Sequence, residues 1–311
     1  MKHTGLSTAF YALLGTGALL GTTTNLAKVA ASMNIAALPF LMWSLMGAAI
    51  FLLSLQLFKG QSIPVNREVI KYSVFSSLLT VAGSNLILFS AIAHVGVSFV
   101  ALAISLPPLL TYVFALFLGM EKACLLRSVG VILSLAGTMV LVAAKWQAPQ
   151  ASHTWLLLTL LGPVLLAAGN IYRTAYWPKG ISPESLVPSM LVAATLILAA
   201  VGGLVPSLQV SLPISGSTLA LLAVQSLVFS GQFVLLFVLQ KAGGPVFLSL
   251  TGPVAALLGI PVAVVLLNER LVPAILPSAV LIATGVGFMV LQQLKIQRLE
   301  NRERASEQLA D

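Results

Sequence analysis

The side chains of this chain that could bind a small molecule are mostly neutral amides set within long apolar stretches. Four lie within such stretches, namely Asn25, Asn85, Asn170 and Gln232. Each amide has donors and an acceptor, and in an apolar environment it costs free energy unless a helix, water or a substrate satisfies it. These residues predict either a binding site for a small polar molecule or hydrogen bonds between helices, and the pattern alone leaves both open.

Two further residues complete the predicted binding site. Trp43 could supply an apolar wall, and Ser105 a hydroxyl, although serines in apolar helices more often bond to helices than to ligands. We therefore expect the substrate to be bound by Asn25, Trp43, Asn85, Ser105, Asn170 and Gln232. The single cysteine, Cys124, has no His or Cys companion at metal-ligand spacing. With no phosphate-binding loop and no catalytic set, the sequence predicts no metal, no cofactor and no enzyme.

The acidic residues near the apolar stretches are Glu121 and Glu269, and each comes just before such a stretch. A carboxylate there meets the positive end of the following helix, so we expect a structural role for both. The remaining acids lie in loops or in the C-terminal tail. A proton-coupled or cation antiporter needs a carboxylate deep in the membrane, and this absence disfavours that mechanism.

The composition indicates that these residues lie in a membrane rather than in water. The chain is 59% hydrophobic and 8% charged, against about 25% charged residues in a soluble domain, and its mean hydropathy is +1.04. The chain is therefore expected to be an all-α integral membrane protein. Ten stretches approach the roughly 20 residues that a spanning helix needs: Leu6–Ala27, Leu38–Phe58, Tyr72–Ala93, Val97–Leu118, Leu126–Ala144, Thr154–Tyr172, Leu186–Val205, Ser217–Leu239, Val246–Leu267 and Leu271–Leu291.

The ten stretches divide into two similar halves. Glu121 and Glu269 are 148 positions apart (269 − 121), as are Gly137 and Gly285 (285 − 137), and both glycines are expected to be structural. Asn25 also matches Asn170, Asn85 matches Gln232, and Ser105-Leu106-Pro107 matches Thr251-Gly252-Pro253. We predict five-helix repeats over residues 1–148 and 149–292, followed by a charged tail over 293–311. Because each repeat has an odd number of spans, the two must be inverted relative to each other.

The basic residues predict the orientation. With ten spans and the N-terminus inside, thirteen of the sixteen Lys and Arg residues lie on the cytoplasmic side. Both termini are then cytoplasmic, as expected in a bacterial inner (plasma) membrane. This bias also explains the net charge of +8 without a nucleic-acid partner.

The segments Leu118–Lys122 and Leu266–Arg270, with the glycine-containing stretches after them, resemble ten-helix members of the drug/metabolite transporter superfamily with two EamA-type repeats. The resemblance covers roughly residues 6 to 292, and Leu19–Thr22 is similar to the first-helix pattern of that family. An arginine common in its second helix has no counterpart here, where Trp43 and Ser44 stand. The resemblance implies a carrier with a central cavity between helices one to four and six to nine, and with helices five and ten at the periphery.

The function expected from these features is secondary transport without ATP. We expect an exporter of small polar or amphipathic metabolites, such as amino acids, that works by alternating access between the two repeats. A multidrug or cation antiporter of the same superfamily is the alternative, as is a non-transporting membrane scaffold or sensor. The expected partners are a small-molecule substrate and membrane lipid, with the protein a monomer or homodimer.

Overall fold

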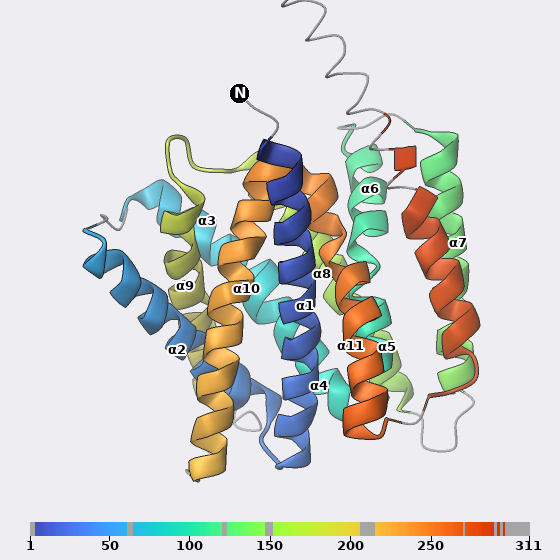
Figure 1. Cartoon of the computed structure of the whole chain (residues 1–311), viewed down its shortest axis with the longest axis horizontal. Coiled ribbons are helices and arrows are strands. Elements are labelled where there is room, and N and C mark those ends of the chain that lie inside the picture. The colour runs from blue at the N-terminus through green and yellow to red at the C-terminus, as the bar shows by residue number, and fades with distance from the viewer. Residues whose placement is uncertain are drawn as a thin grey trace, which may run out of the picture.

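The computed structural model of the chain describes residues 4–60, 65–119, 123–146, 152–205, 215–269, 271–288, 291–292 and 295. In these ranges every regular element is helical (Figure 1). The predicted tail lies almost wholly outside them. The elements are α1 (Thr4–Ser32), α2 (Ala37–Phe58), α3 (Arg67–Ser76), the π-helix η1 (Ser77–Gly83), α4 (Ser84–Val95), α5 (Val97–Ala103), α6 (Pro107–Phe117), α7 (Leu125–Trp146), α8 (His153–Ala175), α9 (Pro183–Leu204), α10 (Gly216–Ser249) and α11 (Thr251–Leu267), with an unlabelled helix at Ile275–Phe288.

The helices are those of an integral membrane protein. Among the described residues, seven helical stretches are long and apolar enough to cross a membrane, and the helices Thr251–Leu267 and Ile275–Phe288 are apolar but shorter. Together with α1, which has 29 residues, they cover the ten stretches predicted from the sequence.

Three of the predicted stretches differ from simple straight helices. The third contains the π-helical segment Ser77–Gly83 between α3 and α4. The fourth is interrupted over residues 104–106, just before Pro107, whose ring and missing N–H prevent helix continuation. In the ninth, the interruption comes at Leu250, and residues 246–249 are the end of α10 rather than the start of a separate span.

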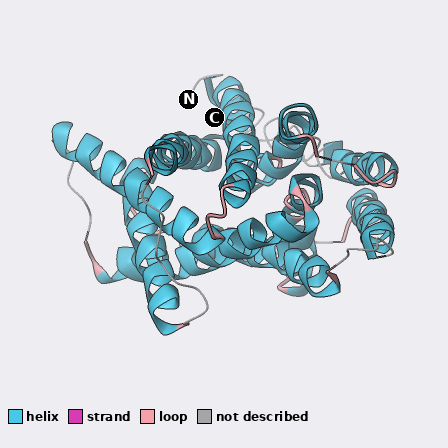
Figure 2. Cartoon of the chain, turned by 90° about the horizontal axis from the view of Figure 1, so that it is seen from below, coloured by secondary structure: helices cyan, strands magenta, loops and turns pink. Residues whose placement is uncertain are grey.

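Two helices, α1 and α8, have corresponding positions in the bundle. The first span, α1, packs mainly against α10 and α11, whereas α8 packs mainly against α4 and α6. The second span, α2, packs against α9. Seen from below, the helices stand side by side around the centre of the molecule (Figure 2). The core residues are therefore contributed by both halves of the chain.

A close contact that α1 makes has a counterpart at α8. A Cβ atom added to Gly15 of α1 would meet Leu235 at 2.7 Å, and one added to Gly162 of α8 would meet Leu88 at 2.7 Å. Gly15 and Gly162 are 147 positions apart (162 − 15), and so are Leu88 and Leu235 (235 − 88). The contact between spans one and eight thus has a counterpart between spans three and six.

The fifth and tenth spans show a second reciprocal contact. α7 and the helix Ile275–Phe288 lie together at one edge of the bundle (Figure 1). The hydroxyl of Ser134 donates to the carbonyl of Ile282, 148 positions along the chain, at 3.2 Å. A Cβ atom on Gly137 would lie 2.8 Å from the carbonyl of Ser278, and one on Gly285 would collide with Ser134. Both glycines therefore stand where two helices meet closely, which is a structural position.

Glu269 holds the N-terminus of a helix other than the one expected. Its carboxylate accepts hydrogen bonds from the backbone N–H groups of Val97 (3.0 Å) and Ser98 (2.9 Å), at the start of α5. The tenth span begins further on, at Ile275. The prediction that this carboxylate meets the helix that follows it is corrected, because the free N–H groups within its reach are those of α5. Glu121 lies outside the described residues.

The close helix crossing of α1 and α11 gives a test of the packing. A Cβ atom on Gly21 would lie 2.9 Å from the carbonyl of Ala255 and 3.2 Å from Cα of Gly259. Gly21→Ala should force the helices apart and lower the free energy of unfolding by about 1–3 kcal/mol. Gly203→Ala is the matched control, because a Cβ atom there meets nothing within 4 Å. Thermal unfolding in detergent should show a lower midpoint for Gly21→Ala alone, and equal midpoints would contradict this account.

A second test concerns the carboxylate of Glu269. Glu269→Gln keeps the size of the side chain but removes its charge and one of its two accepting oxygens. The loss of charge-assisted bonds to α5 should reduce stability by about 1.5–3 kcal/mol, measured as the thermal midpoint and as the yield of monodisperse protein. Glu68→Gln, at an exposed first-turn position of α3, should change both far less. A Glu269→Gln protein as stable as the wild type would show that the two bonds contribute little.

Candidate functional site

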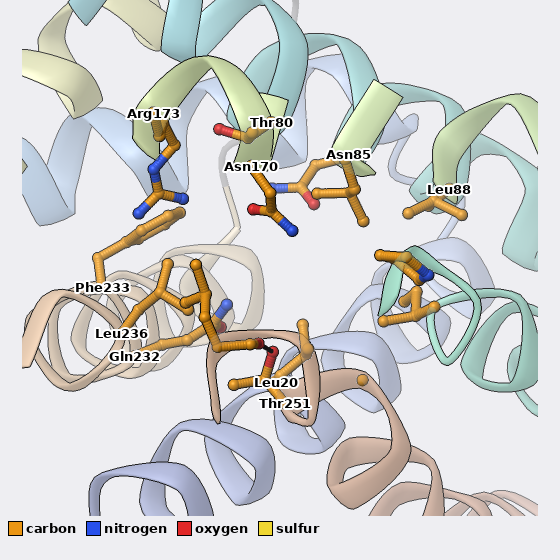
Figure 3. A pocket seen from close by; sticks show the side chains of 15 residues that line it. Leu20, Thr80, Asn85, Leu88, Asn170, Arg173, Gln232, Phe233, Leu236 and Thr251 are labelled. Atoms are coloured by element: carbon orange, nitrogen blue, oxygen red, sulfur yellow. Dashed lines mark hydrogen bonds between the residues drawn. The ribbon is translucent and has the colours of Figure 1, made fainter. Parts of the chain in front are cut away.

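A cavity lies at the centre of the bundle, between the two halves of the chain (Figure 3). Its volume is about 80 Å³, enough for several water molecules, since one needs about 10–15 Å³. The lining comes from α1, η1, α4, α6, α8, α10, α11 and the helix breaks: Leu20, Thr80, Asn85, Leu88, Ile104, Pro107, Leu166, Asn170, Arg173, Gln232, Phe233, Leu236, Leu248, Thr251 and Gly252.

Three of the four predicted amides line this cavity. Asn85 comes from α4, Asn170 from α8 and Gln232 from α10. The Oε1 atom of Gln232 accepts a hydrogen bond of 2.9 Å from the hydroxyl of Thr23 on α1. In the described part of the chain, the side-chain amides of Asn85 and Asn170 bond to no protein group. Their hydrogen-bonding groups are available to a molecule in the cavity, and their role in binding substrate stays a prediction.

The π-helix η1 positions the wall from which Asn85 projects. Its first residue, Ser77, donates to the carbonyl of Met190 on α9 (2.6 Å), and Ser84 after it donates to the carbonyl of Gly162 on α8 (3.0 Å). Thr80 between them lines the cavity but donates to the carbonyl of Ser76, the last residue of α3 (2.7 Å). π-helical segments are often found at functional sites. Here the wide turn places Thr80 and Asn85 on the same wall.

The interrupted fourth and ninth spans form another part of the lining. Ile104 and Pro107 flank the break between α5 and α6, and Thr251 and Gly252 begin α11. The two breaks touch, because a Cβ atom on Gly252 would collide with the carbonyl oxygen of Ile104. The N-termini of α6 and α11 therefore both begin at the cavity.

Arg173 is the one charged residue among those that line the cavity. Its side chain is 2% exposed and comes from α8 on the same face as Asn170, three residues earlier (Figure 3). The sequence analysis counted Arg173 among the thirteen cytoplasmic basic residues and did not place it in the binding site. α8 extends to Ala175, and the Asn170-x-x-Arg173 spacing was the signal that could have indicated a shared face.

The contacts of Arg173 are with neutral groups. Its Nη2 atom donates to Oε1 of Gln240, and its guanidinium carbon lies 4.9 Å from the ring centre of Phe237. Tyr72 interacts with it electrostatically. The buried Nε atom has no hydrogen-bond partner. An uncompensated buried charge is expensive, so this arginine is a candidate binding group.

Asn25, Trp43 and Ser105 are not among the lining residues. Nδ2 of Asn25 donates to the carbonyls of Gly21 (2.8 Å) and Gly259 (3.1 Å), which ties α1 to α11. Trp43 is exposed on α2. Ser105 is buried in the break between α5 and α6 and donates to the carbonyl of Ala101 (3.2 Å).

The register of the reciprocal contacts explains why Asn25 lies elsewhere. The 147-residue shift that relates Gly15 to Gly162 relates Asn170 to Thr23 (170 − 23), not to Asn25. The same shift relates Asn85 to Gln232 (232 − 85). Thr23 and Gln232 are hydrogen-bonded to each other, and Asn170 and Asn85 line the same cavity. Pairing Asn25 with Asn170 was therefore off by two positions, more than half a turn of helix.

A second pocket lies near the far ends of α1 and α4, with Asn34, His94 and Trp155 in its lining. Phe40 and Phe89 also line it, and Phe89 stacks on Phe229 with ring centres 6.3 Å apart. Phe229 in turn contacts Phe233 of the central cavity at 5.8 Å. A chain of aromatic rings thus lies between the two spaces.

Comparison with known proteins shows a family likeness in the first part of the chain. The model of the EamA-like transporter family matches residues 7–143, which confirms the resemblance to the drug/metabolite transporter superfamily. No curated protein sequence matches this chain. Solved structures also match, and one crystal structure among them has a TM-score of 0.64 and 18% sequence identity over 94% of this chain and 99% of its own. At this identity the likeness is one of fold.

The different places of Asn25 and Asn170 predict different effects of mutation. Asn25→Ala removes the hydrogen bond from α1 to Gly259 of α11 and a second bond to Gly21 within α1, and it should lower the free energy of unfolding by about 1–3 kcal/mol. Asn170→Ala removes an amide without a protein partner and should leave the thermal midpoint nearly unchanged. Both variants should be compared in the same detergent. A stable Asn25→Ala protein with impaired transport would instead indicate that Asn25 takes part in substrate binding.

Proposed function

We propose that this chain, whose residues 7–143 match the model of the EamA-like transporter family, carries a small polar metabolite across the membrane through the central cavity. The observation that supports this most is the presence of Asn85, Asn170 and Gln232 in one cavity lined by both halves of the chain. Ligand sites with a few polar groups in an otherwise apolar lining are typical of small-molecule binding. An amino acid or a metabolite of similar size is the substrate class that we propose.

The transport cycle that we propose is alternating access between two inverted repeats. The reciprocal contacts support it: Gly15 with Leu235 and Gly162 with Leu88 are related by one shift along the chain, and Ser134 bonds to Ile282 at the repeat distance of 148. Reciprocal contacts of this kind are expected around a two-fold axis. Substrate sites of inverted-repeat transporters lie at the repeat interface, near interrupted helices, as this cavity does.

We also propose a direction and an energy source for transport. We propose facilitated export, because a metabolite made inside the cell leaves down its own gradient and the sequence shows no carboxylate deep in the spans for proton coupling. The proposed setting is a bacterial inner membrane with both termini in the cytoplasm, in keeping with the positive-inside bias. The aromatic chain from Phe233 to Phe40 then lies between the cavity and the outer side.

The alternatives fit the cavity less well. A cation or multidrug antiporter would bring a positive charge next to Arg173, where a like charge is unfavourable. A scaffold or sensor gives no reason for unpaired amides to face an internal cavity. Uptake and efflux assays separate these alternatives from a metabolite carrier.

The proposal is tested by alanine variants in liposomes. Asn85→Ala and Gln232→Ala should each reduce transport of the cognate metabolite by about ten-fold or more, because one lost hydrogen bond is worth about 0.5–1.5 kcal/mol and an unsatisfied partner adds to it. The readout is initial uptake by purified protein that elutes as a single peak, with a screen of amino acids and organic metabolites supplying the substrate. Thr284→Ala, at an exposed position of the tenth span, is the control. Normal transport by both cavity variants would place the substrate elsewhere.

A further inference from the structure

The electrostatic field in the central cavity is positive. Arg173 provides a full charge, its Nε atom lacks a partner, and its other contacts are with neutral groups. No acidic side chain is among the residues that line the cavity. Neutral Gln240 and Phe237 hold the guanidinium in place without cancelling its charge. The cavity therefore lacks the negative partner that a buried arginine requires.

Two helix ends add to this field. Pro107 begins α6, and Thr251 and Gly252 begin α11, so both helices present their N-termini to the cavity. An α-helix has a partial positive charge at this end. The opposing C-terminal carbonyls of α5 are already occupied. Ala101 accepts from the Ser105 hydroxyl (3.2 Å), Leu102 from the Ser105 N–H (3.1 Å), and Ala103 from the Leu106 N–H (3.0 Å).

We infer that the substrate carries a carboxylate, bound between the guanidinium of Arg173 and the N-termini of α6 and α11. Asn85, Asn170 and Gln232 then hold the uncharged or amino part of the molecule. The guanidinium fork matches a carboxylate. α6 begins with Pro107 and Pro108, which have no N–H, so its N-terminus contributes the positive end of the helix dipole rather than hydrogen bonds. This inference rests on the proposed transport function and names its substrate class.

A carboxylate fits the cavity better than a phosphate ester does. Arg173 is the single charged group in the lining, whereas a phosphate monoester brings a charge of about −1.5 to −2 near neutral pH. The excess negative charge would be uncompensated in a site of low dielectric constant. A free monocarboxylate leaves the occupied site close to neutral, whereas a zwitterionic amino acid pairs its carboxylate with Arg173 but leaves the net positive charge of the site unchanged. The cavity volume of about 80 Å³ also favours a small anion.

The test uses the full-length protein in liposomes with matched probes. Lactate is paired with lactamide and N-acetylglycine with its amide, so that each pair differs in the charge of one group; alanine, inorganic phosphate and ethylammonium complete the set. Binding is measured as the shift of the thermal midpoint and transport as initial uptake. The wild type should prefer each carboxylate over its amide by ten-fold or more.

The variants assign this preference to Arg173. Arg173→Gln should reduce the preference to less than about two-fold, and Arg173→Lys should restore part of it, because lysine keeps the charge but loses the planar fork. Asn170→Asp tests the same charge without changing Arg173, which stays packed on Phe237. The new carboxylate, three residues away on the same helix face, should neutralise the guanidinium and abolish the preference for carboxylates. Arg67→Gln, at an exposed position at the start of α3, should leave it unchanged.

The possible results separate this inference from the proposed function. Uptake of lactamide or ethylammonium in preference to carboxylates, or an Arg173→Gln protein that keeps the wild-type preference, overturns the carboxylate site while transport through the cavity stands. Stronger binding of phosphate than of any carboxylate likewise overturns it in favour of a phosphorylated substrate. If no probe and no member of a wider metabolite screen enters liposomes, the proposed function itself fails.

Discussion

Every polar group inside a membrane protein needs a partner within the chain, and this constraint decides which side chains remain for a substrate. Most hydroxyls on the spans satisfy it within their own helix. Thr16 donates to the carbonyl of Ala12 (2.6 Å) and Thr138 to that of Ser134 (2.9 Å), four residues earlier in each case. Such residues look polar in the sequence yet offer little to a ligand. The amides of Asn85 and Asn170 have no such bond and line a cavity, and these two facts together distinguish a candidate site. Gln225 shows that both are needed, since its buried amide lacks a partner but lies outside the cavity.

The same constraint applies to the backbone where the fourth and ninth spans are interrupted. Pro107 cannot donate to the preceding turn, so residues 104–106 leave the helix and bond locally instead. The interruption is tolerated because it lies against the protein rather than lipid, with Gly252 pressed against the carbonyl of Ile104. A larger residue at position 252 would push the breaks apart. Close packing of the two interruptions is therefore what brings the helix N-termini and the cavity together.

The features that could be predicted from the sequence are those with a local signal along the chain. Apolar length located all ten stretches, because the thickness of a bilayer sets the length of a spanning helix. The match between Asn85 and Gln232 has the same 147-residue spacing as the two glycine contacts, and both residues line the cavity. The exposed position of Trp43 could not be predicted. Because α2 is apolar on almost every face, no apolar stripe shows which side of this helix faces the bundle. Arg173 was assigned by its place near a span end, where basic residues usually report orientation. Its burial depends on the longer α8 and on Phe237 and Gln240 from α10, contacts that no local pattern reveals.

The two halves differ most where the charge lies. The shift of 147 residues that relates Asn85 to Gln232 relates Arg173 to Leu26 (173 − 26), an apolar and partly buried residue of α1. At this shift Asn85 pairs with another amide, Asn170 pairs with the hydroxyl of Thr23, and Arg173 has no charged counterpart. The packing does not follow the division into halves. α8, which carries Asn170 and Arg173, packs against α4 of the first half, which carries Asn85, whereas Gln232 lies on α10, which packs against α1. Figure 3 accordingly shows Asn85 beside Asn170, with Gln232 on the other side of the cavity. A ligand shifts a conformational equilibrium only through a difference in contacts, so in the alternating-access cycle that we propose Gln232 is the polar side chain whose contact with a substrate held by Arg173 can change between states.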